Sequence, residues 1–189
     1  TRSLSSAASD VYKRQAMNST LGLMEIGAVR ATKDYQETGK FNPNSRTLTS
    51  FNTDSRITPT VRSNGVLLGQ ISPRGGIVSG SSSVMRFDAW NWEDAVVRSD
   101  EGIHMNWPKS RVAAKVNNEL DIKKVKSKER NTKNEIHDFF KIAKAYAKKN
   151  SLTVDLRMEA MRNIFIAKKR LYIHADKVFQ IKEIIEFKK

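Results

Sequence analysis

The fold class is decided by one short segment near the end of the chain, Arg170-Leu171-Tyr172-Ile173-His174, whose middle is apolar. A predicted helix capped by Asp155 precedes this segment, and apolar residues with helical spacing follow it from Val178 to Ile185. A strand between two helices is typical of α/β proteins, in which helices cover a largely parallel sheet. The sequence therefore predicts an α/β fold.

The rest of the chain divides into a strand-rich first half and a helical second half. Short apolar runs at residues 66–71 and 83–88 are predicted as strands. The glycine-rich run at residues 75–80 has the glycine spacing of a P-loop but lacks the Lys that would reach a phosphate, so it is interpreted as a turn. Further along, Thr132-Lys133-Asn134-Glu135 has the pattern of a capping box and predicts that a helix begins there.

Composition excludes several classes of protein. The 189 residues contain no cysteine, which excludes disulfide scaffolds, thiolate zinc sites and cysteine nucleophiles. No apolar run reaches the roughly 20 residues of a membrane-spanning helix, so we expect no membrane span. The net charge of +14 is concentrated in residues 109–189, which hold 22 of the 34 basic residues. Such a half can bind nucleic acid, but a Lys-rich solvated helix has the same composition, and we favour that interpretation.

Both ends of the chain suggest a cut. Residues 1–15 are small and polar, resemble translated adapter sequence, and are interpreted as a non-native, disordered leader. At the other end, helical spacing runs to within a few residues of Lys189 without a Gly or Pro stop. The folded unit is therefore expected to span residues 16–189, with a basic, loosely ordered connection at 109–131.

The three histidines are the first candidates for chemistry. His104 precedes a proline-bounded loop and is interpreted as structural, and His137 is interpreted as a surface residue of a charged helix. His174 ends the apolar segment described above. In a β/α barrel, catalytic groups converge at the carboxyl ends of the strands. From position alone, a packed or hydrogen-bonded role for His174 remains favoured over a metal role.

Several segments resemble a bacterial amidohydrolase family close to imidazolonepropionase. The resemblance begins with LGLMEIGAVRAT at residues 21–32 and ends with LYIHAD at residues 171–176. Between them it includes residues 41–44, 52–55, 58–66, 75–80, 88–94 and 157–162. It covers most of residues 17–187 and is weakest from 109 to 130. Several matches in the same order are more specific than a single motif.

The resemblance implies a metal-dependent (β/α)8 barrel that hydrolyses carbon–nitrogen bonds in cyclic or linear amides. In such a family a divalent metal, zinc in the first instance, activates water and polarises the carbonyl under attack. The family's ligands are an H-x-H pair on the first strand, histidines on the fifth and sixth strands, and an Asp on the eighth. His174 matches the fifth-strand ligand. Asn18-Ser19-Thr20 stands in place of H-x-H, and the expected catalytic Asp lies beyond the end of the chain.

The sequence therefore predicts a partial TIM-type (β/α)8 barrel, from about the first to the fifth strand. Its expected function is that of a fragment of a metal-dependent hydrolase with a small-molecule amide as substrate. The alternative is a catalytically inactive, amidohydrolase-like pseudoenzyme, because the Asn18 amide and the Thr20 hydroxyl are poor substitutes for imidazole. A basic nucleic-acid-binding module is the third interpretation. Proteins of this family are often exported, but compartment and oligomeric state stay open.

Overall fold

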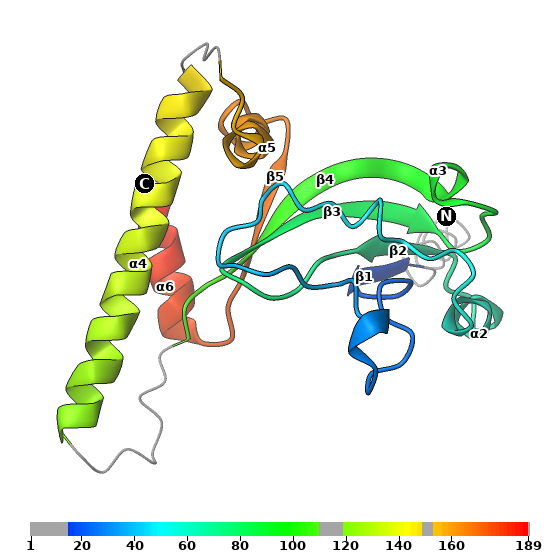
Figure 1. Cartoon of the computed structure of the whole chain (residues 1–189), viewed down its shortest axis with the longest axis horizontal. Coiled ribbons are helices and arrows are strands. Elements are labelled where there is room, and N and C mark those ends of the chain that lie inside the picture. The colour runs from blue at the N-terminus through cyan, green and yellow to red at the C-terminus, as the bar shows by residue number, and fades with distance from the viewer. Residues whose placement is uncertain (1–14, 110–118, 149–152, 189) are drawn as a thin grey trace, which may run out of the picture.

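The computed structural model describes residues 15–109, 119–148 and 153–188, and its architecture is mixed α/β (Figure 1). The elements follow the chain as β1 (Gln15–Ser19), η1 (Arg30–Thr32), α2 (Ile57–Ser63), β2 (Leu68–Ile71), β3 (Val78–Arg86), α3 (Trp92–Ala95), β4 (Val96–Asn106), α4 (Glu119–Lys148), α5 (Leu156–Phe165), β5 (Arg170–His174) and α6 (Val178–Phe187). The leader expected at residues 1–15 lies outside the described residues, except for Gln15, which begins β1.

The strands form one sheet in the order β1-β2-β3-β4-β5. β1 is parallel to β2 and β4 is parallel to β5, whereas β3 runs antiparallel to both of its neighbours. The sheet is curled (Figure 1), and a cavity of about 230 Å³ inside the curl is lined by residues from all five strands. The sheet is thus a half-barrel, and the face that lines this cavity is called the inner face below.

The antiparallel β3 departs from the all-parallel order of a TIM-type barrel. β2 ends at Ile71 and β3 begins at Val78, so the link between them is far shorter than the dozen or more residues of a parallel crossover. Gly75 and Gly76 in this link both have positive φ angles, 83° and 60°, which glycine adopts without strain. The prediction of a glycine-rich turn between two strands is therefore confirmed for residues 75–77, whereas residues 78–80 of the predicted turn already belong to β3.

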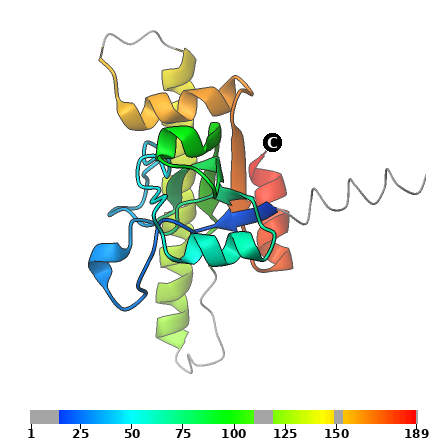
Figure 2. The same ribbon diagram turned by 90° about the vertical axis from the view of Figure 1, so that its right-hand side faces the viewer.

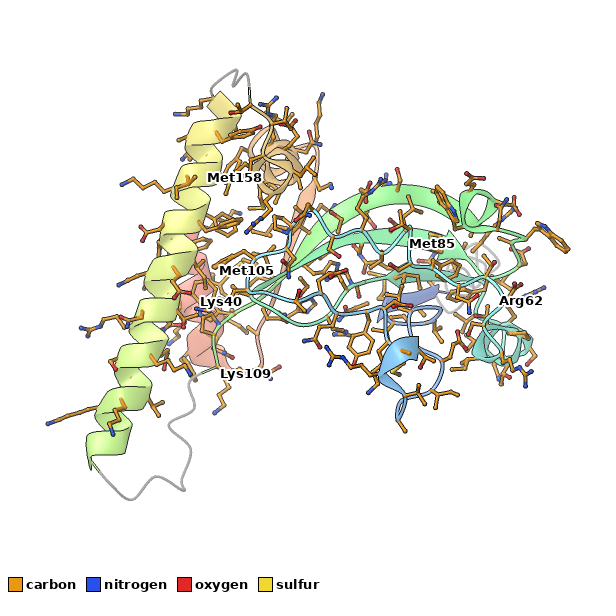
Figure 3. The ribbon with its side chains drawn as sticks, viewed as in Figure 1. Lys40, Arg62, Met85, Met105, Lys109 and Met158 are labelled. Carbon is orange, nitrogen blue, oxygen red and sulfur yellow. The ribbon has the colours of Figure 1, made fainter. Side chains whose placement is uncertain are left out.

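Two apolar clusters hold the half-barrel together. The larger one packs Val78, Ile103 and Met105 of the sheet against Ile136 and other residues of α4 and α5. The smaller one joins β2 and β3 to the loops near α2 and α3, and contains Met85. Figure 3 shows Met105 and Met85 toward opposite ends of the sheet. Because both clusters lie on the face away from the cavity, the inner face is left for polar side chains.

The three C-terminal helices cover one end of the sheet, where α4 and α6 lie beside each other (Figure 1) and α5 crosses α4 (Figure 2). The capping-box prediction at Thr132 is wrong, because α4 begins at Glu119. The Thr132 hydroxyl instead donates to the Lys128 carbonyl oxygen one turn earlier, at 2.9 Å, as a threonine inside a helix can. Residues 119–131 of the expected loose connection are therefore helical, and residues 110–118 lie outside the described residues.

The end of the chain follows the prediction closely. Asp155 caps α5 by accepting hydrogen bonds from the amides of Arg157 and Met158. Residues 170–174 form β5, and α6 follows it. None of the described helices is both long and apolar enough to cross a lipid bilayer.

Candidate functional site

Five polar residues gather at the carboxyl ends of the parallel strands. Asn18 is at the end of β1, Ser72 and Arg74 follow β2, and His104 and His174 are at the ends of β4 and β5. We call these five residues the mouth cluster. In a barrel this edge of the sheet is where ligand-binding groups converge.

The register between β4 and β5 brings the two histidines together. His104 pairs with Tyr172, and Asn106 pairs with His174, so all four side chains lie on the inner face. Nδ1 of His104 lies 2.9 Å from Nε2 of His174, and the two rings stack with centroids 5.1 Å apart. The His104 ring also stacks on Tyr172 at 4.8 Å. One hydrogen bond therefore links the imidazoles, with donor and acceptor set by the tautomers.

Both imidazoles are held neutral. Burial, with smaller contributions from His174 and the positive charge of Arg74, lowers the pKa of His104 from 6.5 to about 3. Burial and Arg74 also lower the pKa of His174, against a weaker opposite effect of Asp176. His104 is only 1% exposed, and its Nε2 has no hydrogen-bond partner among the described residues. A buried imidazole nitrogen without a partner is uncommon and calls for an explanation.

The end of β5 is fixed by a buried glutamine of α6. Oε1 of Gln180 accepts hydrogen bonds from the amides of Asp176 and Lys177, and its Nε2 donates to the Pro108 carbonyl oxygen. The Trp107 amide donates to the His174 carbonyl oxygen at 3.0 Å. Because Pro108 and Trp107 follow β4, these bonds hold the ends of β4 and β5 in one arrangement.

Asn18 is held by three bonds to β2 and the residues that follow it. Its amide donates to Oε1 of Gln70 at 3.3 Å, its carbonyl oxygen accepts from Nη2 of Arg74 at 2.8 Å, and its side-chain Oδ1 accepts from the Ser72 hydroxyl at 2.6 Å. Its φ angle of 52° lies in the left-handed region, where asparagine is enriched among residues other than glycine. Asn18 therefore has a structural role at this end of β1.

Asn106, at the end of β4, forms hydrogen bonds with the glycine-rich turn. Its Nδ2 donates to the carbonyl oxygens of Gly75 and Gly76 and to the Ser79 hydroxyl. These bonds attach the turn between β2 and β3 to the end of β4. Arg74 directly precedes this turn, and its amide donates to the Tyr35 carbonyl oxygen at 2.7 Å.

Among the described residues, the divalent metal site that the resemblance implies is incomplete. Oδ1 of Asn18 is engaged by Ser72, and Nε2 of His174 faces His104 rather than open space. The positive charge of Arg74 acts on both imidazoles and opposes a cation between them. Within residues 15–109, 119–148 and 153–188, no group of three or more His, Asp or Glu side chains is placed to hold a metal ion.

Sequence reasoning identified His174 and Asn18 but missed the partners that surround them. His104 was interpreted as structural, and the structure indeed buries it, but against His174 at the mouth. The alternation of Ile103 and Met105 with His104 and Asn106 along one strand was the available signal. Arg74 carried no sequence signal, and Thr20 makes no side-chain hydrogen bond in the described structure.

The comparisons with known proteins bear on the fold. No family model matches the chain, and no curated protein matches it. Among solved structures, the chain is similar to the amidohydrolase from Thermotoga maritima MSB8, with a TM-score of 0.75 and 23% sequence identity. The alignment covers 91% of this chain and 47% of that one, so the chain spans about half the length of the matched structure. The half-barrel described here thus has an amidohydrolase-like fold.

Proposed function

We propose that this chain belongs to an amidohydrolase-like (β/α)8 protein that binds a small molecule of the amide type at the mouth cluster without hydrolysing it through a metal. This is the pseudoenzyme interpretation of the sequence. The fold supports the position of the binding site, because the mouth cluster lies where such folds place their ligands. The activity and substrate of the whole protein are part of the proposal.

The state of Asn18 is the observation that carries the proposal. Where the related family has the first histidine of its metal pair, this chain has an asparagine whose Oδ1 accepts a 2.6 Å hydrogen bond from Ser72. That bond uses one of the two lone pairs of the amide oxygen, and a neutral amide oxygen is a poor ligand for metals that favour nitrogen donors. The guanidinium of Arg74 bonds the carbonyl oxygen of the same residue and adds a positive charge there. The hydrogen bond from Ser72 and the charge of Arg74 together favour an organic ligand over a metal ion at this site.

A second candidate is a metal-dependent hydrolase of non-peptide carbon–nitrogen bonds, as the resemblance implies. The specific observation in its favour is the pair formed by His104 and His174. Both imidazoles are neutral, and neutral imidazole is the form that binds zinc. In that case the two histidines would supply nitrogen ligands, and further ligands would come from residues that the structure does not describe.

Metal content and turnover separate the two candidates. The whole (β/α)8 protein proposed above is dialysed against Zn²⁺ and then against metal-free buffer, and its bound zinc is measured by mass spectrometry. Hydrolysis of a panel of linear and cyclic amides is followed with and without metal. We expect less than stoichiometric zinc and no metal-dependent hydrolysis. Stoichiometric zinc that is lost in His174→Ala but kept in the exposed control His137→Ala would instead establish the hydrolase.

A gain-of-ligand variant tests the role of position 18 directly. Asn18→His/Thr20→His restores the two imidazoles of the family's pair, and histidine tolerates the left-handed region better than most residues. We expect this variant to bind zinc more tightly than the original chain. The control Asn18→Ala/Thr20→Ala removes the same side chains without adding ligands. Equal zinc affinity in all three proteins would contradict the assignment of residues 18–20 to the metal position.

A further inference from the structure

We propose that the mouth cluster binds the oxyanion group of a small organic molecule, a carboxylate or a phosphate, through the guanidinium of Arg74 and the buried side-chain amide of Gln70. The inference rests on the proposed function, since it adds an oxyanion group to the amide-type ligand that we propose for the mouth. A carboxylate and a phosphate are both oxyanions that accept hydrogen bonds from several N–H groups. The experiment below distinguishes between the two.

Arg74 has the charge for this role and lacks an acidic partner. Arg46, Arg86, Arg98 and Arg170 all form ion pairs with carboxylates. Arg74 forms none with any described residue, and its recorded side-chain bond is to the Asn18 carbonyl oxygen. Its remaining N–H groups are available, and a guanidinium matches the geometry of a carboxylate or phosphate with two parallel bonds.

Gln70 supplies a donor that is buried and has no acceptor. The residue is 4% exposed and lines the cavity inside the half-barrel. Its Oε1 accepts from the Asn18 amide, which fixes the side chain so that Nε2 carries the two N–H groups. Nε2 has no hydrogen-bond partner among the described residues. A buried donor without an acceptor costs about 1–3 kcal/mol, and a ligand oxygen would remove that cost.

The two donors are held next to each other by one residue. Arg74 bonds the carbonyl oxygen of Asn18 at 2.8 Å, and Gln70 bonds its amide at 3.3 Å. Both side chains therefore bond the backbone of a single residue at the end of β1. We infer that an oxyanion beside Asn18 accepts from both.

The surrounding charge favours an anion over a cation. The acid beside His174 is Asp176, and Lys109 already pairs with it at 2.6 Å. The mouth cluster contains no carboxylate, so the positive charge of Arg74 is not balanced within it. When His174 donates to Nδ1 of His104, the proton of His104 is on Nε2, which then becomes a further buried donor. Each of these features stabilises negative charge.

The cavity limits the size of the ligand. Its volume of about 230 Å³ is below the roughly 300–1,000 Å³ of pockets that hold drug-sized molecules. Leu68, Val84 and Tyr172 contribute to its lining beyond Gln70. Arg74 does not line this cavity but Gln70 does, so we infer a short organic anion that accepts from Arg74 and extends toward the cavity at Gln70.

The probes are sodium phosphate and sodium succinate, titrated separately into the intact 189-residue chain at pH 7 in constant chloride. Binding is measured by calorimetry, and long-range ¹H–¹⁵N spectra follow the imidazole signals of His104 and His174, with the exposed His137 as an internal control. We expect saturable binding of at least one anion, with shifts at His104 and His174 and none at His137. The anion that binds more tightly identifies the source as phosphate or carboxylate.

Matched variants locate the site. We expect Arg74→Gln to raise the dissociation constant at least tenfold, and Arg74→Lys to raise it less. The control is Arg62→Gln, because Arg62 is an exposed residue of α2 at the far end of the molecule (Figure 3). We expect this control to leave the dissociation constant unchanged. Gln70→Leu has a similar volume but removes the donor, together with the Oε1 that accepts from the Asn18 amide, and should weaken binding several-fold. Circular dichroism checks that each variant is folded. If Arg74→Gln does not fold, the comparison of Arg74→Lys with the original chain still tests the role of Arg74.

Two results would overturn the inference. The first is the absence of saturable binding for both anions. The second is equal weakening by Arg74→Gln and Arg62→Gln, with no shift at His104 or His174, which would show general attraction to a basic surface. Metal-dependent amide hydrolysis together with anion binding at Arg74 would refute the proposed function and leave this site intact.

Discussion

At the scale of single residues, Asn18 links the backbone of β1 to Ser72 and Arg74 of the mouth cluster. Its left-handed φ of 52° allows the carbonyl oxygen to meet Arg74 while the side chain meets Ser72. A residue other than glycine in this region carries backbone strain of about 1–3 kcal/mol, which a side-chain hydrogen bond can partly offset. Asn18 therefore combines two requirements that few residue types meet.

Substitutions at Asn18 separate the backbone requirement from the side-chain bond. Asn18→Ala loses the Ser72 bond and keeps the strain, whereas Asn18→Gly loses the bond but adopts the same φ freely. We expect Ala to be less stable than Gly by about 1 kcal/mol in urea unfolding. An Ala variant as stable as the Gly variant would mean that residue 18 is not in the left-handed region.

The buried His104 gives the stability of the protein a defined pH dependence. Its folded pKa of about 3 is below the ordinary 6.5, so between these values the unfolded chain binds a proton that the folded chain does not. The free energy of unfolding is therefore fully retained above pH 6.5 and falls with decreasing pH, by about 1.4 kcal/mol per unit for this one group, until about pH 3. His174, whose pKa is also lowered, adds to the loss in the same direction.

Urea unfolding between pH 4.5 and 7.5 measures this slope. In His104→Gln the part of the slope due to His104 is absent, so its stability should depend less steeply on pH than that of the original chain. Parallel pH profiles for the two proteins would show that His104 is not buried in the folded state.

At the scale of elements, β4 and β5 depend on a glycine for their close contact. A Cβ atom added at Gly102 would lie 2.4 Å from Cε2 of Tyr172 and 3.0 Å from the Arg170 carbonyl oxygen. Tyr172 cannot move freely, because its ring stacks on His104 and its hydroxyl donates to Glu101. This glycine therefore sets the position of β5 against β4.

Gly102→Ala should destabilise the protein by about 1–3 kcal/mol, the usual cost of overpacking a well-packed site. The control is Gly27→Ala, since an added Cβ at Gly27 meets no atom within 4 Å and its φ is not positive. Thermal unfolding of both variants measures the difference. Similar melting temperatures for the two would contradict the β4–β5 register.

Elements with a local signal were predictable and those with a tertiary origin were not. The segment 170–174 and the Asp155 cap were recognised because an apolar run and a capping carboxylate are local features. The first half of β3 was missed because Ser79, Ser81, Ser82 and Ser83 are buried there without any apolar pattern. The histidine pair was missed because it depends on the register of strands 70 residues apart. The start of α4 was misplaced because Thr132 serves inside a helix.

At the scale of the whole molecule, α6 has apolar residues on two faces. Ile184 and Phe187 pack against the larger cluster, while Val178, Ile181 and Ile185 are 71%, 49% and 58% exposed. Exposed apolar side chains grouped on one element promote association in water. We therefore expect this chain to associate when it is expressed alone.

Replacing the exposed side chains tests this expectation. We expect Ile181→Lys/Ile185→Lys to lower the average mass measured by light scattering at high concentration while the circular dichroism spectrum is unchanged. Ile136→Lys, which places a charge in the larger cluster, is the contrasting variant and should unfold the protein. An equal tendency to associate before and after the α6 substitutions would rule out this face as the cause.

The central claim is that β4 and β5 bring two neutral imidazoles together at the mouth of an amidohydrolase-like half-barrel. The most direct measurement is a long-range ¹H–¹⁵N spectrum of the histidine side chains at pH 5. We expect His104 to be neutral, with the chemical shifts of a single tautomer that is hydrogen bonded to His174. A fully protonated His104 at that pH would contradict the claim, because a buried partner of His174 could not carry that charge.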